Sequence, residues 1–366
     1  MQLVYLSPVP WSSFAQRPHK FVEWFHASTD GDVLWVDPYP TRFPLLSDFR
    51  RLTAQADPEK HQAPPWLKVV RPAALPIEPL PASGMVNGVM WRSMLNDLDI
   101  FSRRSRTMLA IGKPSVLALL VLERLDGVIS VYDAMDDFSS FYAGFSRLAM
   151  SRRERKLVGR VTHVLVSSTA LKQHWSSVRS DVKLVPNGLD ASVLPVFKIG
   201  ALERERKILG YVGTIGPWFD WEWLVSLARA RPADVVRLIG PMFTPSPYLL
   251  PENIEILPPC AHQDALMAMQ NFDVGLIPFK TNKLTSSVDP IKYYEYRALG
   301  LPVISTEFGE MAYRGDAEGV FLSNGGQEIN KLVQKALLYS PNEETVKQFT
   351  DGNTWETHFA AAKIIQ

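Results

Sequence analysis

The sequence has one cysteine, no long apolar run and almost no net charge. Cys260 alone among 366 residues excludes a framework of internal disulfides and is typical of proteins from reducing compartments. No stretch approaches 18 uninterrupted apolar residues, so the sequence predicts no membrane-spanning helix. The formal net charge of +1 argues against a surface built for nucleic acid. These absences favour a cytoplasmic protein that does not bind nucleic acid.

The first residues carry no sign of a secretion signal. An apolar run from Met1 to Leu6 leads straight into Ser7 and Pro8, and no basic segment precedes it. A signal peptide needs such a segment and a longer apolar core. We therefore expect the first strand of a folded domain here.

Positive charge is concentrated in the first half of the sequence. Residues 1–190 contain 23 Lys and Arg against 18 Asp and Glu, whereas residues 191–366 contain 16 against 20. The excess gathers in three clusters: Arg50 and Arg51; Arg103, Arg104 and Arg106; and Arg152, Arg153, Arg155 and Lys156. Such clusters can rest on anionic lipid headgroups, at about 1 kcal/mol for each basic residue. The protein would then lie peripherally on the inner face of the cytoplasmic membrane; solvated helix faces are the alternative.

Length and pattern predict two α/β domains. A single core rarely grows beyond about 250–300 residues, and short apolar runs alternate here with helical patterns, which is typical of doubly wound parallel sheets. We expect a first domain at 1–190, a linker at 191–206 and a second domain at 207–354, with a C-terminal helix at 355–366 that packs back on the first. Ligands of such sheets bind beyond the carboxyl ends of the strands, so we expect the site in a cleft that two Rossmann-like domains face.

Twelve apolar runs bounded by turn residues are predicted to be strands. Those of the first domain are Leu3–Leu6, Val33–Val36, Leu67–Val70, Val128–Val131, His163–Val166 and Val182–Val185. Those of the second domain are Leu209–Val212, Val235–Ile239, Ile254–Leu257, Val274–Ile277, Val303–Ser305 and Val320–Leu322.

The most specific motif is the block 287–305, SVDPIKYYEYRALGLPVIS. Pro290 and Ile291 open a predicted helix, and Lys292 and Glu295 lie three residues apart on one face of it. A helix start with a lysine suits the phosphates of a nucleoside diphosphate. Glu295 can accept hydrogen bonds from both ribose hydroxyls. An ordinary surface Lys–Glu pair is the alternative.

Over this block the sequence resembles the donor-binding domain of nucleotide-sugar-dependent glycosyltransferases of GT-B fold, whose helix of this kind ends in Gly-Leu-Pro-Val. The resemblance implies the GT-B fold, a nucleotide-sugar donor, and neither a metal nor another cofactor. In the retaining branch of that superfamily a glutamate stands eight positions before the ribose-binding residue. This sequence has Ser287 there, which argues against the retaining group.

Further positions of the second half are assigned to the donor site. Gly213 and Thr214 lie in a glycine-rich loop after a predicted strand, where backbone can approach a diphosphate closely, and this loop looks like the family's donor loop. His262 and Phe279 fall where the xanthan glucuronosyltransferase, an enzyme of the same fold, lines its nucleotide pocket. Phe279 would then stack on the base; core packing is its alternative.

Three carboxylates follow the predicted strand Val128–Val131 and indicate a general base. Asp133, Asp136 and Asp137 would repel one another, and burial or repulsion can raise the pKa of one of them into the range for proton transfer. The segment resembles the loop that carries the catalytic Asp of the xanthan glucuronosyltransferase, an inverting enzyme, which assigns the base to Asp136. Asp133 and Asp137 stay open as alternates, and a helix N-cap is the alternative role for Asp136 or Asp137. No metal site is expected, because no His or Glu nearby completes a ligand set.

The segment Gln16-Arg17-Pro18-His19 resembles the start of the first helix in a group of cell-envelope glycosyltransferases. The resemblance implies that Arg17 faces the cleft, where it could meet an acceptor phosphate or a donor oxygen. A structural role for Arg17 is the alternative.

The sequence as a whole predicts an inverting, metal-independent glycosyltransferase with a UDP-sugar as donor and a glycan or lipid-linked oligosaccharide as acceptor. Two other classes stay open. A sugar-nucleotide epimerase of the same fold would need acid and base groups around the donor sugar, and the basic first domain weighs against it. A non-catalytic partner protein would keep the fold and lose the base, and the presence of Asp136 and Glu295 weighs against that.

Overall fold

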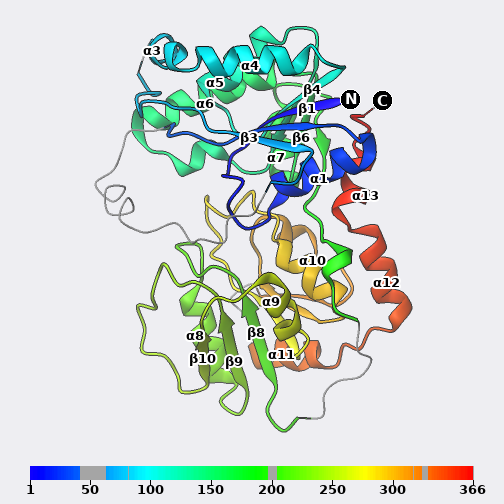
Figure 1. The fold of residues 1–366 in the computed structure, drawn as a ribbon. Coiled ribbons are helices and arrows are strands. Elements are labelled where there is room, and N and C mark those ends of the chain that lie inside the picture. The colour runs from blue at the N-terminus through cyan, green and yellow to red at the C-terminus, as the bar shows by residue number, and fades with distance from the viewer. Residues whose placement is uncertain (42–62, 81, 197–203, 316, 324–328, 366) are drawn as a thin grey trace. The chain divides into compact units, whose positions relative to one another are not determined.

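The computed structural model describes residues 1–41, 63–80, 82–196, 204–315, 317–323 and 329–365 (Figure 1). The basic pair at 50–51 and part of the predicted linker, 197–203, lie outside these ranges. The chain divides into two compact units, here called the N-domain (Met1–Val185 with Phe359–Gln366) and the C-domain (Pro186–His358). In the described part of the chain, no helix is both long and apolar enough to cross a membrane.

The N-domain is built on a parallel sheet with the strand order β3-β2-β1-β4-β5-β6-β7. Its strands are β1 (Gln2–Leu6), β2 (Val33–Val36), β3 (Leu67–Val70), β4 (Thr107–Ile111), β5 (Ile129–Ala134), β6 (His163–Val166) and β7 (Lys183–Leu184). Its helices are α1 (Arg17–Thr29), α3 (Ser83–Met90), α4 (Arg92–Ser102), α5 (Val116–Arg124), α6 (Gly144–Val158) and α7 (Thr169–Ser176), with the 3₁₀ helix η1 (Phe138–Phe141). The chain first builds the sheet on one side of β1 and then on the other, so the strand order reverses between β1 and β4, where ligands of such sheets bind.

Strand β4 is absent from the predicted strands. Its sequence, Thr-Met-Leu-Ala-Ile, contains three strong helix formers, but all five residues are buried and pair in parallel with β1 on one side and β5 on the other. Tertiary pairing therefore overrides local propensity. Strand β5 is also longer than predicted, because it continues to Ala134 and takes Asp133 into the sheet.

The C-domain repeats this architecture with the strand order β10-β9-β8-β11-β12-β13, again all parallel. Its strands are β8 (Ile208–Val212), β9 (Val235–Ile239), β10 (Ile254–Leu257), β11 (Val274–Ile277), β12 (Val303–Thr306) and β13 (Val320–Ser323). Its helices are α8 (Trp221–Ala230), α9 (His262–Met269), α10 (Ile291–Ala298), α11 (Ile329–Leu337) and α12 (Glu343–Gly352), with 3₁₀ helices η2 (Ala191–Val193) and η3 (Gly309–Tyr313). Here the strand order reverses between β8 and β11.

The last helix, α13 (Trp355–Ala361), ends in the N-domain. The ring of Phe359 lies 5.2 Å from that of Phe21 and 5.4 Å from that of Trp24, both on α1. Lys183 of β7 donates a hydrogen bond to the carbonyl of Ala362 at 2.7 Å. The C-terminal residues therefore complete the N-domain beside α1 and β7.

Candidate functional site

Lys292, Glu295 and His262 form an ion-pair cluster at the carboxyl edge of the C-domain sheet. Helices α9 and α10 follow strands β10 and β11, so their first turns lie at this edge. The Lys292 ammonium lies 2.5 Å from Oε2 of Glu295, and Nε2 of His262 lies 2.8 Å from Oε1. Glu295 is only 5% exposed, unlike the carboxylate of an ordinary surface pair.

The charge of Glu295 is fixed by its neighbours. Burial by itself would raise the pKa of Glu295, but the ammonium of Lys292 and the hydrogen bond with His262 outweigh it and lower the pKa. A carboxylate of this kind stays ionised at neutral pH, and both its oxygens point to donors. It is suited to accept hydrogen bonds from a polyol such as a ribose.

The glycine loop assigned to the donor site packs closely against a second glycine. Gly213 has φ 152° and Gly240 has φ 140°, a region that favours glycine. A Cβ on Gly240 would lie 2.3 Å from the carbonyl oxygen of Gly213. The loops after β8 and β9 therefore contact each other through backbone atoms. Thr214 lies beside this contact, and its carbonyl accepts a hydrogen bond from the Tyr211 hydroxyl at 2.9 Å.

Residues at the start of the donor block are held by a cluster that the sequence patterns do not reveal. Pro290 is the N-cap of α10, which begins at Ile291, and Ser287 is buried just before it. Asp289 accepts hydrogen bonds from Arg314 at 2.8 Å, from Tyr294 at 2.9 Å and from the backbone of Asn187 at 2.8 Å. Arg314 follows η3, far from the block in sequence, and no pattern marks it. This cluster fixes where α10 starts.

Phe279 is half-buried among aromatic rings. Its ring lies 4.9 Å from that of Phe308 and 6.2 Å from that of Tyr211, and its backbone bridges to Phe219. These contacts support the core-packing alternative more than a ring free to stack on a base.

In the N-domain, Arg17 and Asp133 form a buried ion pair. Nε of Arg17 lies 3.0 Å from both carboxylate oxygens of Asp133 and Nη2 lies 2.8 Å from Oδ1, while Nη1 donates to the carbonyl of Val185 at 2.8 Å. The side chains are 1% and 0% exposed. Their contacts support the structural role of Arg17 over the acceptor-side role, and they leave Asp133 poorly placed to act as a base.

Asp136 follows β5 by two residues and is half-buried. Among the residues that the structure describes, no hydrogen-bond partner is found for its carboxylate. Burial raises the pKa of Asp136 to about 7, helped by the charge of Asp137 and opposed by that of Arg17. A carboxyl group with these properties exchanges protons readily near neutral pH.

Asp137 follows Asp136 in the sequence, and its charge also acts on a third acid, Glu154. Asp137 stands at the N-cap position of η1, but its side chain makes no capping hydrogen bond to a backbone amide there. Its carboxylate instead accepts hydrogen bonds from the hydroxyls of Ser139, at 2.7 Å, and Ser140. Glu154 of α6 is 3% exposed and accepts the hydroxyl of Tyr132 at 2.6 Å. Burial raises the pKa of Glu154 to about 8. Burial thus brings the pKa values of both Asp136 and Glu154 close to neutrality.

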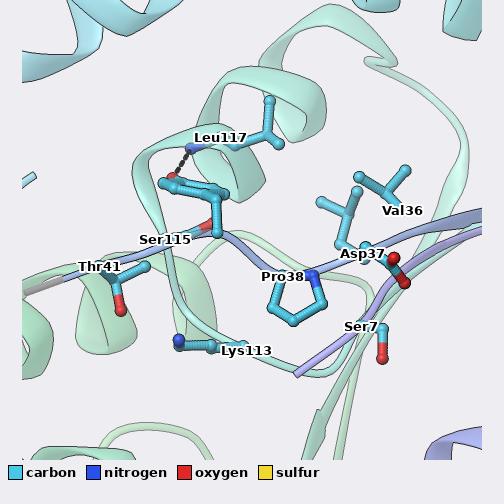
Figure 2. Close-up of a pocket in the computed structure, with 10 residues that line it drawn as sticks. Ser7, Val36, Asp37, Pro38, Thr41, Lys113, Ser115 and Leu117 are labelled. Atoms are coloured by element: carbon cyan, nitrogen blue, oxygen red, sulfur yellow. Dashed lines mark hydrogen bonds between the residues drawn. The ribbon is translucent and has the colours of Figure 1, made fainter. Parts of the chain in front are cut away.

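A small hollow lies where β1, β2 and β4 end, lined by Ser7, Asp37, Thr41 and Lys113 among others (Figure 2). Its volume of about 20 Å³ leaves room for about one water molecule. The first amides of α5 are already bonded, Val116 to the carboxylate of Glu78 and Leu117 to the hydroxyl of Tyr39, both at 3.1 Å. The hollow is therefore too small to hold a sugar, and the nearby amides of α5 are already hydrogen-bonded within the protein.

Within the described ranges, no group of three or more His, Cys, Asp or Glu side chains is placed to hold a metal ion. The positive charge at the C-domain cluster comes from Lys292 and from the amides at the start of α10.

Solved structures share this architecture over the whole chain. A UDP-forming α,α-trehalose-phosphate synthase from Burkholderia vietnamiensis matches with a TM-score of 0.61 and 12% identity, over 99% of this chain and 96% of that one. The catalytic domain of starch synthase IV from Arabidopsis thaliana gives 0.60 and 10% identity, over 99% and 97%. The glycosyltransferase AviGT4 gives 0.58 and 11% identity, over 99% and 97%. The fold is GT-B.

Sequence comparison adds one curated relative to these GT-B structures. TuaH of Bacillus subtilis, named as a teichuronic acid biosynthesis glycosyltransferase, is 24% identical over 197 residues. The match spans 48% of this chain and about half, 50%, of TuaH. No family model matches the sequence.

Proposed function

We propose that the protein is a glycosyltransferase that moves a sugar from a UDP-sugar to a hydroxyl of a cell-envelope glycan or lipid-linked oligosaccharide. The observation that carries the proposal is the buried, ionised Glu295 between Lys292 and His262 at the start of α10. The GT-B fold and the similarity to TuaH support it. The choice of uridine as the nucleoside is supported by the trehalose-phosphate synthase of the same fold, which is a UDP-forming enzyme.

In this proposal the C-domain holds the donor. Glu295 accepts the two ribose hydroxyls, and Lys292 with the amides at the start of α10 holds the diphosphate. The backbone of Gly213 and Thr214 offers a close approach for the phosphates. Because these groups supply the positive charge, the reaction requires no metal ion.

Asp136 of the N-domain is the proposed base. It takes the proton of the acceptor hydroxyl while that oxygen attacks the anomeric carbon of the donor sugar. The bond from the anomeric carbon to the diphosphate breaks, and the diphosphate leaves with the electron pair. Lys292 and the start of α10 stabilise the charge that develops on it. Attack from the face opposite the leaving group inverts the anomeric carbon.

The proposal is tested by supplying UDP-, GDP- and TDP-sugars with either lipid-linked or soluble oligosaccharides, in EDTA. We expect release of UDP that depends on an acceptor, a gain of one sugar mass on that acceptor, and loss of both with Asp136→Asn. Solvent deuterium in the recovered donor sugar would instead identify an epimerase. Nucleotide binding without release, whatever donor and acceptor are paired, would identify a non-catalytic partner protein.

A further inference from the structure

Helix α3 exposes its apolar side chains and buries its polar ones. Its four large apolar side chains are 46–77% exposed: Met85, Val86, Val89 and Met90. The buried hydroxyl of Ser83 donates to the carbonyl of Glu78 at 3.1 Å, and the buried Asn87 side chain bonds both backbone groups of Leu75, at 2.9 and 3.1 Å. The polar side of α3 thus anchors the loop before it, and the apolar side is left facing outward.

A second group of exposed apolar side chains lies on η1 and the start of α6. Phe141, Phe145 and Leu148 are 55%, 82% and 56% exposed. The elements that carry the two groups are joined on their buried sides, because the carbonyl of Glu78 accepts hydrogen bonds both from Ser83 of α3 and from Arg153 of α6. Helix α5 packs against α3 and α6 alike, and the three helices lie together in Figure 1. We call this surface, α3 with η1 and α6, the apolar–basic face.

Basic side chains predominate on this face. Residues 71–80 and 82–95, together with 138–156, contain two acids, Glu78 and Glu154, and these are 0% and 3% exposed. Both point inward, to Tyr39 and to Tyr132. Five arginines of the same segments are exposed: Arg71, which pairs with Asp37, and Arg92, Arg147, Arg152 and Arg155. Arg153, grouped with them by sequence, is instead only 13% exposed, paired with the buried Glu78.

We propose that the apolar–basic face docks the protein on a bilayer that contains anionic lipid. Exposed apolar side chains that share a surface with arginines fit the boundary between acyl chains and anionic headgroups. A second copy of this chain fits less well, because a two-fold contact through this face would bring arginine against arginine. Glu123 of α5, an exposed carboxylate beside α6, is already paired with Lys156 and Arg160 of its own chain. Membrane docking through this face does not depend on which reaction the protein catalyses.

The test is co-sedimentation of the full chain with vesicles of phosphatidylcholine alone and of phosphatidylcholine with phosphatidylglycerol. We expect binding to the anionic vesicles that falls with added salt. Met85→Asp with Phe145→Asp should weaken it at least about tenfold, because charge is placed among the inserted side chains. Arg147→Glu with Arg152→Glu should weaken it by at least about tenfold and remove the preference for anionic vesicles.

The matched control is Phe243→Asp with Leu249→Asp in the C-domain, where the side chains are 74% and 90% exposed and the binding should not change. All variants alter exposed residues, and their thermal melts show whether they fold. No binding to anionic vesicles, or binding that both variants of the face retain, would overturn the proposal. A dimer in solution that either variant converts to a monomer, without vesicle binding, would show that a second copy covers the face.

Discussion

Asp136 and Glu295 follow strands of two similar parallel sheets, yet their surroundings move their pKa values in opposite directions. At Glu295 the effect of burial is outweighed by Lys292 and His262, so the pKa is lowered. At Asp136 burial dominates and Asp137 adds to it, so the pKa rises to about 7. One of these carboxylates is thus held as an anion, and the other titrates near neutral pH.

The largest expected effect is on catalysis and separates Asp136 from its neighbour. Asp136→Asn should lower kcat by about 10²- to 10⁴-fold, the usual contribution of a general base. Asp137→Asn should lower it far less, because the Asp137 carboxylate already accepts the hydroxyls of Ser139 and Ser140. The measurement is acceptor-dependent nucleotide release. Equal losses of kcat in the two variants would contradict the assignment of the base to Asp136 rather than Asp137.

The next effect separates a structural carboxylate from a catalytic one. Asp133→Ala leaves the Arg17 charge buried without its carboxylate partner and should lower the free energy of unfolding by about 3–5 kcal/mol. Chemical denaturation measures this. The control is Asp181→Ala in the exposed pair with Arg179, where a much smaller change is expected. A stable Asp133→Ala protein would mean that the pair contributes little.

A third effect tests what Lys292 binds. Lys292→Gln should weaken UDP binding about tenfold, since a hydrogen bond to a charged group contributes about 1.5–3 kcal/mol, and should leave uridine binding nearly unchanged. Calorimetry with both ligands gives the two affinities. Lys283→Gln, an exposed lysine of the loop before α10, is the control. If Lys292→Gln also lost uridine binding, Lys292 would contact the nucleoside rather than the diphosphate.

The rate should follow the ionisation of Asp136. Because the base must be deprotonated, kcat/KM should rise about tenfold per pH unit below about 7 and level off above it. A profile measured from pH 5 to 9 with saturating and limiting donor checks this. A flat profile across pH 6 to 8 would exclude Asp136 as the group that titrates.

The smallest effect concerns stability. The pKa of Asp136 is raised in the folded state, so folded protein holds the proton between about pH 4 and 7 while the unfolded chain has lost it. Stability is therefore lost as the pH rises through that window. Asp136→Asn removes this penalty and should raise Tm by a few degrees at pH 8 and hardly at all at pH 4. A lower Tm at pH 8 would indicate an undetected structural role.

How much the sequence predicts depends on how local each feature is. The helix from Ile291 and its Lys–Glu pair lie within five residues, so spacing alone predicts their contact. Arg17 and Asp133 are 116 residues apart, and no local pattern tells that Arg17 turns into the sheet. The contact between Arg314 and Asp289 spans 25 residues, and no local pattern predicts it either.

Two elements escape prediction because packing overrides composition. Strand β4 is made largely of helix formers, yet it pairs on both sides at the middle of its sheet. Helix α3 carries four large apolar side chains, and an apolar pattern of this kind predicts burial. In the structure Ser83 and Asn87 instead occupy the buried side of the helix, where they form hydrogen bonds with the preceding loop. In both cases hydrogen bonds to a distant or irregular segment decide the outcome.

The central claim is that the C-domain cluster binds a nucleoside diphosphate while the N-domain aspartate acts on another substrate. The most direct measurement is a thermal-shift screen in EDTA with UDP, GDP, TDP, CMP and ADP, on wild-type protein, Glu295→Gln and Asp136→Asn. UDP should raise Tm in the wild type and in Asp136→Asn but not in Glu295→Gln. No shift with any nucleotide in folded wild-type protein, or an undiminished shift in Glu295→Gln, would contradict it.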